Sequence, residues 1–197
     1  MRFTLKAFLL AVVLTAIGSA QSQAAFVTNG GFEMGNFTGW TQFGNTGFTG
    51  VQSGAFGGVP PHSGNFQAFF GPVGSTGGIS QSITGLTVGD SYNLSFWLHN
   101  FGGTPNFFSA IVDGNTAFTG TNLPAQPYTL VSYNFTASNT STSLVFTTQQ
   151  NPSFFLLDSV SVTANAVPAP AGLLLGLTGL PIFGVVARLR RRNAVQA

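Results

Sequence analysis

The stretch YNLSFWLHN at residues 92–100 alternates between apolar and more polar side chains. In an extended chain, successive side chains point to opposite sides. This alternation therefore predicts a β-strand with one face buried in a core and the other face free for polar contacts. The buried side is predicted to carry Tyr92, Leu94, Phe96 and Leu98, and the other side Asn93, Ser95, Trp97 and His99.

Runs of the same kind occur on both sides of this stretch, separated by clusters of Gly, Pro, Asn and Ser. Two of the intervening segments are turn signals, Thr87-Val88-Gly89-Asp90 and the hairpin pair Asp113-Gly114. Helical periodicity of useful length does not appear between the two chain ends. We therefore predict an all-β fold, a two-sheet antiparallel β-sandwich or jelly roll over residues 25–166. The further strands are predicted at 65–70, 78–83, 107–112, 129–136, 143–148 and 154–162, and residues 43–61 are predicted to form a long surface loop.

Charged residues make up only 5% of the chain, against about 25% in ordinary soluble domains. All six Lys and Arg residues lie near the two ends, so residues 25–166 contain four acids and no base. Without cations, this region lacks what nucleic acid binding requires, and it has no phosphate-clamping Arg or Schiff-base Lys. The absence of Cys excludes disulfides and thiolate chemistry. The four acids are Glu33, Asp90, Asp113 and Asp158.

The N-terminal residues 1–24 have the pattern of a secretory signal peptide that is cut by signal peptidase. Arg2 and Lys6 supply the positive charge, an apolar stretch follows from residue 7 to 17, and Ser22-Gln23-Ala24 is the small-residue cleavage site. An uncleaved membrane anchor is the alternative, although the apolar stretch is short for the ~20 residues of a span. We expect the signal segment to be helical and the protein to be exported.

The C-terminal end carries a second hydrophobic segment, which spans about residues 171–187 and is followed by an Arg cluster. Its length is at the lower limit for a transmembrane helix, and the cluster is expected to stay cytoplasmic. A buried core helix is the alternative interpretation. We expect a transmembrane helix here, followed by a short tail at 193–197.

These C-terminal features resemble the PEP-CTERM sorting signal of Gram-negative bacteria, over residues 167–192. The resemblance is carried by a Pro motif, the Gly/Leu-rich span and the terminal basic cluster, although Ala169 stands where the family has Glu. It implies processing by an exosortase-type membrane protease after a transient stay in the inner membrane. The matching residues are Val167, Pro168, Ala169, Pro170, Arg188, Arg190, Arg191 and Arg192.

The predicted sandwich resembles galactose-binding-like jelly rolls of the carbohydrate-binding-module type. The resemblance runs through residues 26–163, and it implies a two-sheet sandwich whose first and last strands lie together. Its pieces occur in the family's order, as NGGFE at 29–33, FTGW at 37–40, HSG at 62–64, ISQSI at 79–83, GDSYNLSFWL at 89–98 and FLLDSVSV at 155–162.

Glu33 and Asp158 match the acids that in the resembled family help to bind a structural calcium, with carbonyl ligands around Asn29 and Ser63. Calcium takes six to eight oxygen ligands from carboxylates and carbonyls. By alternation Asp158 shares a strand face with Leu156 and Val160, where a carboxylate without a partner is costly. The sequence leaves two interpretations open, which are a structural calcium site at Glu33 and Asp158 and two ordinary exposed turn acids.

Trp97, His99 and Asn93 are the candidate sugar-binding residues. Aromatic rings beside neutral amide and hydroxyl groups suit the C–H faces and hydroxyls of a neutral sugar. In the alternative interpretation, Trp97 packs under a loop or into the second sheet. Tyr128 is assigned either to the same binding face or to loop packing, and Trp40 to the core.

The remaining polar residues do not form a catalytic pattern. His62 and His99 have no linking motif, Asp90 and Asp113 lie at turns, and paired carboxylates for acid–base chemistry are lacking. We therefore expect no enzyme activity. The leading hypothesis is a surface or extracellular-matrix protein that binds extracellular polysaccharide; a purely structural or adhesive protein and, less favoured, a secreted hydrolase are the alternatives.

Overall fold

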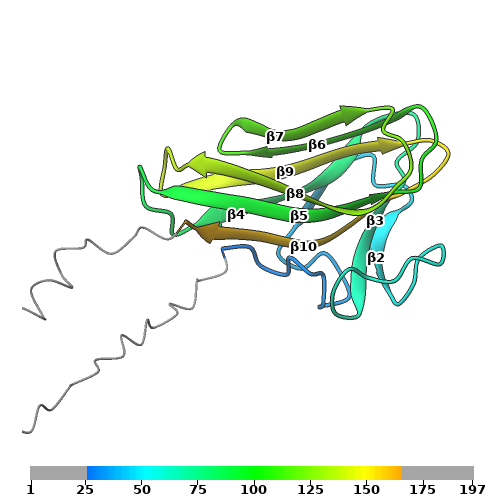
Figure 1. Ribbon diagram of the computed structural model, residues 1–197, viewed down its shortest axis with the longest axis horizontal. Coiled ribbons are helices and arrows are strands. Elements are labelled where there is room, and N and C mark those ends of the chain that lie inside the picture. The colour runs from blue at the N-terminus through cyan, green and yellow to red at the C-terminus, as the bar shows by residue number, and fades with distance from the viewer. Residues whose placement is uncertain (1–25, 166–197) are drawn as a thin grey trace, which may run out of the picture.

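The computed structural model describes residues 26–165. The predicted signal segment 1–24, the sorting signal 167–192 with its span 171–187, and the tail 193–197 therefore lie outside the described residues. Within residues 26–165, no helix is long and apolar enough to cross a membrane. These residues form two layers of antiparallel strands, as the sequence predicts (Figure 1).

Each layer is a sheet of five strands. The strand order of the first sheet is β1-β4-β9-β6-β7, and that of the second is β2-β3-β10-β5-β8. The strands of the first sheet are β1 (Thr41–Gly44), β4 (Gly77–Thr84), β9 (Ser141–Gln150), β6 (Asn106–Val112) and β7 (Asn115–Thr121). The strands of the second sheet are β2 (Thr49–Ser53), β3 (Phe66–Phe70), β10 (Phe155–Ala164), β5 (Ser91–Asn100) and β8 (Gln126–Thr136).

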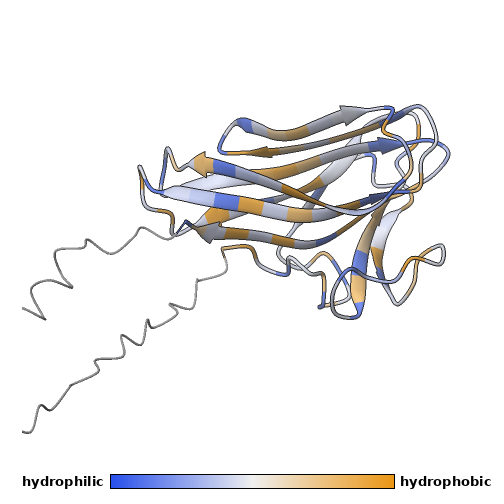
Figure 2. Cartoon of the chain, viewed as in Figure 1, coloured by the Kyte–Doolittle hydropathy of each residue, from blue (hydrophilic) through white to orange (hydrophobic). Residues whose placement is uncertain are grey.

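The core lies between the two sheets and is rich in Phe. Phe96 of β5 packs edge-to-face on Phe146 of β9, and Phe108 of β6 contacts Phe155 of β10 at 5.3 Å between ring centroids. The four apolar residues of the deciding stretch are all buried in this core, which confirms the predicted alternation. Hydrophilic and hydrophobic bands alternate along β5 for this reason (Figure 2). Trp40 is also a core residue, as predicted.

All seven predicted strands correspond to β3, β4, β5, β6, β8, β9 and β10, with small differences at their ends. Asp113 and Gly114 both have positive φ and join β6 to β7 as the predicted tight hairpin. The strands β1, β2 and β7 were not predicted. They are short edge strands rich in Thr and Gly, so they have no strong apolar alternation. Because β2 occupies Thr49–Ser53, the prediction of one loop over 43–61 is wrong.

The start of the described chain runs beside β10 without forming a strand. Phe26 N–H donates to Val162 O, and Val160 N–H donates to Gly30 O at 2.9 Å. Only glycine fits at position 30, because a Cβ there would lie 1.9 Å from Val160 O. The first strand β1 itself lies in the other sheet from β10, so the implied pairing of first and last strands is wrong. The segment before β1 takes that place instead.

Candidate functional site

The outer face of the second sheet carries the predicted sugar-binding residues. Trp97 of β5 is paired with Asp158 of β10, and His99 is paired with Leu156. These residues alternate with the core residues of β5 and β10, so their side chains project away from the sandwich interior. His99 nevertheless retains only 9% of its exposure, and Leu156 retains none. Another part of the chain must therefore cover this face.

The cover is the connection between β2 and β3, residues 54–65, which we call the strap. Its main anchor is Gln67, a fully buried residue of β3. Gln67 Nε2 donates to the carbonyls of Gly54 and Val59, both at 2.9 Å. Gln67 Oε1 accepts a hydrogen bond of 2.6 Å from the Tyr128 hydroxyl of β8. The buried amide of Gln67 thus links the strap at Gly54 and Val59 to Tyr128 of β8, the strand at the opposite edge of the sheet from β2.

Aromatic rings hold the first half of the strap on the sheet. Phe56 stacks on Phe69 of β3 with ring centroids 4.8 Å apart, and it meets Phe154 edge-on at the same distance. Phe56 also contacts Phe101 at 6.2 Å. Leu156 is buried without belonging to the main core cluster. The strap and the outer face therefore form a second, smaller apolar cluster outside the sandwich interior.

The second half of the strap places His62 on Trp97. The two rings are stacked, with centroids 3.9 Å apart and an angle of 16° between their planes. His62 Nδ1 also lies 3.1 Å from the Ser159 hydroxyl, which lies 2.8 Å from the Ser63 hydroxyl. Trp97 is thus packed under a loop, which is the alternative that the sequence left open. One face of its ring is taken by His62.

Both predicted calcium ligands anchor the return of the strap into β3. Glu33 accepts backbone hydrogen bonds from Asn65 and Phe66 at 3.0 to 3.1 Å. Asp158 accepts one from Ser63 at 3.0 Å and another from its neighbour Ser159. Burial raises the pKa of the Asp158 carboxyl, and the hydrogen bonds from the backbone partly oppose this effect. The two acids therefore order the segment that carries His62.

The two acids approach the same glycine. A Cβ on Gly31 would lie 3.7 Å from Glu33 Cγ and 3.8 Å from Asp158 Oδ1. Residues 26–165 contain no Lys or Arg to neutralise them. Oε1 of Glu33 and Oδ1 of Asp158 each accept two hydrogen bonds, so the other oxygen of each carboxylate is the freer one. In charge, this pair fits calcium. The carbonyl of Asn29 fits less well, because it already accepts hydrogen bonds from Phe32 N and Trp40 Nε1. Among the described residues, no three metal-binding side chains gather.

A β-bulge explains how Asp158 reaches this position. The register of β10 against β5 shifts between Asp158 and Ser161, and Ser159 has φ of 54°. Asp158 shares the outer face with Leu156, as predicted, but the bulge turns Val160 into the core. The predicted sharing of one face by Asp158 and Val160 is therefore wrong. Strict alternation fails where an extra residue enters one strand.

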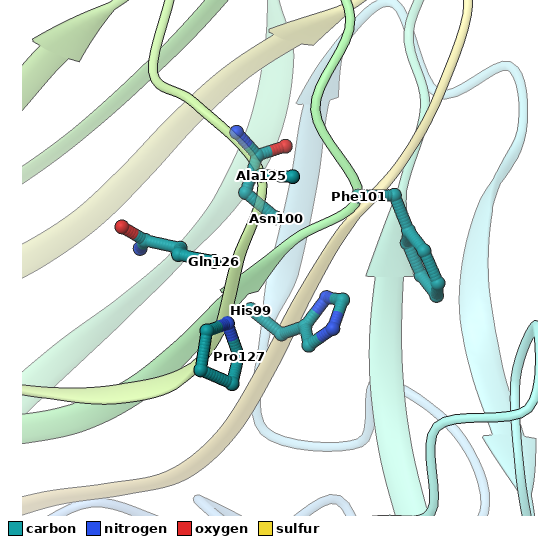
Figure 3. A pocket seen from close by; sticks show the side chains of 6 residues that line it. All are labelled: His99, Asn100, Phe101, Ala125, Gln126 and Pro127. Carbon is teal, nitrogen blue, oxygen red and sulfur yellow. The ribbon is translucent and has the colours of Figure 1, made fainter.

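A cavity of about 340 Å³ opens beside His99, at the end of β5 and the start of β8 (Figure 3). We call it the His99 pocket. His99 Nδ1 is buried and has no hydrogen-bond partner, which is rare for a buried polar atom. Burial lowers the pKa of His99, so its imidazole is neutral at pH 7 and offers one donor and one acceptor. The pocket is lined by His99, Asn100, Phe101, Ala125, Gln126 and Pro127.

The walls of the His99 pocket are mostly apolar. The ring of Phe101 lies 4.5 Å from the His99 ring, and Pro127 lies on the other side of the imidazole in Figure 3. The Asn100 amide is committed, since it donates to Leu123 O and Pro124 O and accepts from Gly102 N and Gln150 Nε2. His99 therefore supplies the side-chain polarity of the pocket, since the Gln126 amide points away from the His99 ring in Figure 3.

The three predicted sugar-binding residues share one face but not one pocket. Six residues of strand separate Asn93 from His99, or about 20 Å at ~3.3 Å per residue. The Asn93 amide donates to Ser132 Oγ and Asn134 Oδ1 on β8. Tyr128 packs against both His62 and His99, each at 5.7 Å. Phe101, Gln126 and Pro127 were missed, since they lie at strand ends where alternation carries no signal.

A second cavity, of about 320 Å³, lies near the same end of the sandwich. It is lined mainly by apolar groups, including Phe48, Val73 and Phe154. Ionisable side chains do not line it. Its neutral polar residues are Asn151 and Ser153, so it differs from the His99 pocket in having no imidazole in its lining.

Comparison with known proteins assigns the family of this sandwich. The family model described as a carbohydrate binding domain matches residues 24–153, about two thirds of the chain. The chain belongs to this family of carbohydrate-binding domains. The matched region contains every residue of the His99 pocket, whereas Asp158 lies beyond it. Among curated proteins, none matches the chain.

Solved carbohydrate-binding modules share this fold. TmCBM61, solved in complex with β-1,4-galactotriose, has a TM-score of 0.60 at 18% identity, covering 72% of this chain and 99% of its own. The CBM22-1–GH10 modules of a Clostridium thermocellum xylanase, solved with xylohexaose, have a TM-score of 0.53 at 22% identity. That match covers 74% of this chain and 30% of the larger xylanase chain. At these identities the likeness establishes the fold and leaves the ligand to be argued from the site.

Proposed function

We propose that this protein is a non-enzymatic carbohydrate-binding protein that holds neutral polysaccharide at the His99 pocket. The observation that supports it most directly is the neutral His99 imidazole, which lines an open cavity beside the ring of Phe101. Membership of a carbohydrate-binding family makes a sugar the proposed ligand of this cavity.

The chemistry of the pocket matches that of a sugar ring. Phe101 and Pro127 offer apolar surfaces for the C–H face of a pyranose, as aromatic and aliphatic walls do in ligand sites. The neutral His99 imidazole supplies an uncharged polar group for hydroxyl groups. Because residues 26–165 contain no Lys or Arg, nothing in this region favours an anionic polymer. A neutral glycan is therefore the proposed ligand.

The alternative of a secreted hydrolase finds less support. His62, Ser159 and Asp158 lie close together, but the hydrogen bond joins His62 Nδ1 to the Ser159 hydroxyl, while the Asp158 carboxylate accepts backbone amides. A catalytic triad needs the carboxylate on the imidazole nitrogen that does not face the serine. The geometry orders a turn instead of activating a nucleophile.

A purely structural or adhesive protein is the second candidate, and one observation favours it. His62 covers a face of Trp97, the aromatic ring that the sequence singles out for stacking on a sugar. If the His99 pocket does not bind a glycan, the outer face of the second sheet is a packed surface with no sugar site. The two candidates differ in one measurable property, which is binding to neutral glycans.

Export and sorting complete the proposal. We infer that signal peptidase removes residues 1–24, and that an exosortase-type membrane protease processes the signal at 167–192 after a transient stay in the inner membrane. The destination is the cell surface or the extracellular matrix, where polysaccharide is the partner. Mass spectrometry of the mature protein tests this. Loss of both end segments supports the inference, and an intact C-terminal Arg cluster on the exported protein contradicts it.

The binding proposal is tested on an array of neutral and acidic glycans with the purified protein. We expect binding to neutral glycans, lost in His99→Ala and kept in Asn93→Ala, which alters the same strand about 20 Å away. Retained melting temperature in both variants shows that the fold is intact. If the unaltered protein binds none of the neutral glycans, the structural alternative is favoured. If it releases sugar from any glycan, the hydrolase is favoured.

A further inference from the structure

The second cavity, which we call the Phe48 cavity, lies at the same end of the second sheet as the His99 pocket. At this end the terminal paired residues of the five strands form one row across the sheet, which is Thr49, Phe70, Phe155, Asn100 and Gln126. The backbone pairing continues one residue beyond this row. Gly71 N–H donates to Phe48 O at 2.9 Å, and Phe101 N–H donates to Phe154 O at 3.1 Å. Phe48 and Phe154 line the Phe48 cavity, whereas Phe101 lines the His99 pocket.

The two cavities border one cluster of aromatic rings. Phe56 of the strap contacts Phe154 at 4.8 Å and Phe101 at 6.2 Å between ring centroids. Each of these two Phe residues lines one of the cavities. They extend neighbouring strands of the sheet, β10 and β5, which lie about 4.8 Å apart. The cavities are therefore close enough together for one chain of sugar units to contact both.

Phe48 presents its ring to solvent. It is 70% exposed, the highest value among the large exposed hydrophobic residues of 26–165. Its φ of 53° lies in the left-handed region, which a bulky side chain rarely adopts. The loop that carries it is tied down by Asn45, whose Oδ1 accepts from Gly47 N–H and whose Nδ2 donates to Val73 O at 2.8 Å. The fold therefore holds an aromatic ring at the surface in a conformation that costs free energy, as is common at ligand-binding positions.

Neutral polar groups lie beside this ring. The Asn151 amide and the Ser153 hydroxyl line the same cavity. The hydrogen bond that Asn151 donates within residues 26–165 comes from its backbone N–H, to Pro105 O at 3.2 Å, so its side-chain amide remains for a ligand. An aromatic ring beside a neutral amide and a hydroxyl suits the C–H face and the hydroxyls of an uncharged sugar.

Resting on the proposed function, we propose that the Phe48 cavity is a second sugar subsite, so that one neutral polysaccharide chain contacts it and the His99 pocket together. Phe48 follows the sheet order at β2, three strands from β5, which places it about 14 Å from Phe101 at ~4.8 Å per strand. That span exceeds the length of a disaccharide. A short oligomer therefore fills the His99 pocket alone, and a longer one also reaches Phe48, which makes Phe48 the residue that determines preference for chain length.

The experiment compares short and long oligomers. β-1,4-linked oligomers of galactose, xylose and glucose, and of any other neutral glycan bound on the array, are titrated at two and at six units by isothermal titration calorimetry. For a series that binds, we expect the hexamer to bind about tenfold more tightly than the dimer. Phe48→Ala is expected to weaken hexamer binding about fivefold and to leave dimer binding within about twofold, because only the hexamer reaches the ring. His99→Ala is expected to weaken both.

Two further variants serve as controls. Val88→Ala removes an apolar side chain that is 58% exposed in the turn before β5, at the opposite end of that strand from the two cavities. It is expected to leave dimer and hexamer binding unchanged. Phe48→Tyr keeps the aromatic ring and is expected to bind the hexamer within about twofold of the unaltered protein. Unchanged melting temperatures show that the variants are folded.

Failure of this inference is distinct from failure of the proposed function. If the unaltered protein binds dimer and hexamer equally, or if folded Phe48→Ala binds the hexamer as tightly as the unaltered protein, the second subsite is overturned while carbohydrate binding stands. An equal loss of dimer and hexamer binding in Phe48→Ala also overturns it, because the ring would then act on the His99 pocket. If the unaltered protein binds no neutral glycan, both proposals are overturned.

Discussion

The two halves of β5 present the same alternating pattern to the outer face of one sheet, yet they differ in environment. At one half, Asn93 and Ser95 lie beside Ser132 and exposed Asn134 of β8 in an open polar surface. At the other half, Trp97 and His99 are covered by the strap and Tyr128. The comparison teaches that alternation fixes which way a side chain points, while a distant loop fixes whether it is available to a ligand.

The largest expected effect comes from releasing the strap. Gln67→Ala removes three hydrogen bonds of a fully buried amide, to the Gly54 and Val59 carbonyls and from the Tyr128 hydroxyl, so we expect a loss of about 2–4 kcal/mol in the free energy of unfolding. Urea denaturation measures it. The control is Gln52→Ala, a neighbour across β2 and β3 whose amide makes one partly exposed hydrogen bond to Ala55. An equal loss in both variants contradicts the anchoring role of Gln67.

Glycan binding is expected to depend on the covered half of β5, which carries Trp97 and His99, and not on the open half. His99→Ala is expected to weaken neutral-glycan binding at least tenfold, about 1.4 kcal/mol, because the hydrogen bonds of the imidazole to sugar hydroxyls are lost. Asn93→Ala, in the open half, is expected to leave binding within twofold. Isothermal titration calorimetry measures both. The reverse order of effects would move the site to the open polar surface.

Calcium is expected to raise the melting temperature through Glu33 and Asp158. At a calcium concentration ten times the dissociation constant, the gain is about 1.4 kcal/mol by mass action. Glu33→Gln removes one charge and should abolish the gain, whereas Asp113→Asn alters an acid that bonds to Ser138 near the β6–β7 turn and should not. A melting curve of the unaltered protein that is identical in calcium and in EDTA excludes the site.

The smallest expected effect is a pH dependence of stability that His99 produces. Its pKa is lowered in the folded state by burial, so the folded protein resists protonation more than the unfolded chain. Stability is then full above the unfolded value of about 6.5 and falls as pH drops below it. Thermal melts between pH 7.5 and 5 measure this fall, which His99→Gln should reduce. If the melting temperature of His99→Gln falls with pH as steeply as that of the unaltered protein, another titratable group causes the pH dependence.

Asp158 contributes a pH dependence of opposite sign. Burial raises its pKa above the ordinary value of 3.8, so the folded state favours the protonated acid. This contribution is full below that ordinary value and is lost as pH rises through the raised one. The two titrations oppose each other, so the slope seen in His99→Gln reports what Asp158 and other groups add.

Most of the fold follows from local pattern. Residues 92–100 have apolar side chains at alternating positions, 143–148 and 154–162 are short runs rich in apolar residues, and each lies in a strand as predicted. The edge strands β2 and β7 escaped prediction because Thr and Gly give little apolar contrast. The β-bulge at Ser159 was not predicted for a different reason. A bulge depends on how two strands pair, so the sequence of one strand alone does not reveal it.

The site was predicted in part. Trp97 and His99 were placed on the correct face, because period-two alternation is a property of the chain itself. The cover over them was not foreseen, because it depends on Gln67 and Tyr128, which are 61 residues apart and meet through one hydrogen bond. Phe101 and Pro127, which wall the pocket, lie just beyond or at the start of a strand, where the pattern ends.

By itself, the sequence determined an all-β sandwich poor in charge and without Lys or Arg, a Phe-rich core and the outward direction of the polar residues of β5. These properties depend on composition and on the alternating geometry of an extended chain. Only the tertiary structure decided that His62 covers Trp97, that the Glu33 and Asp158 carboxylates bond to the backbone of residues 63–66, and that a cavity opens beside His99. Those features arise where segments distant in sequence pack together, and no local period encodes such contacts.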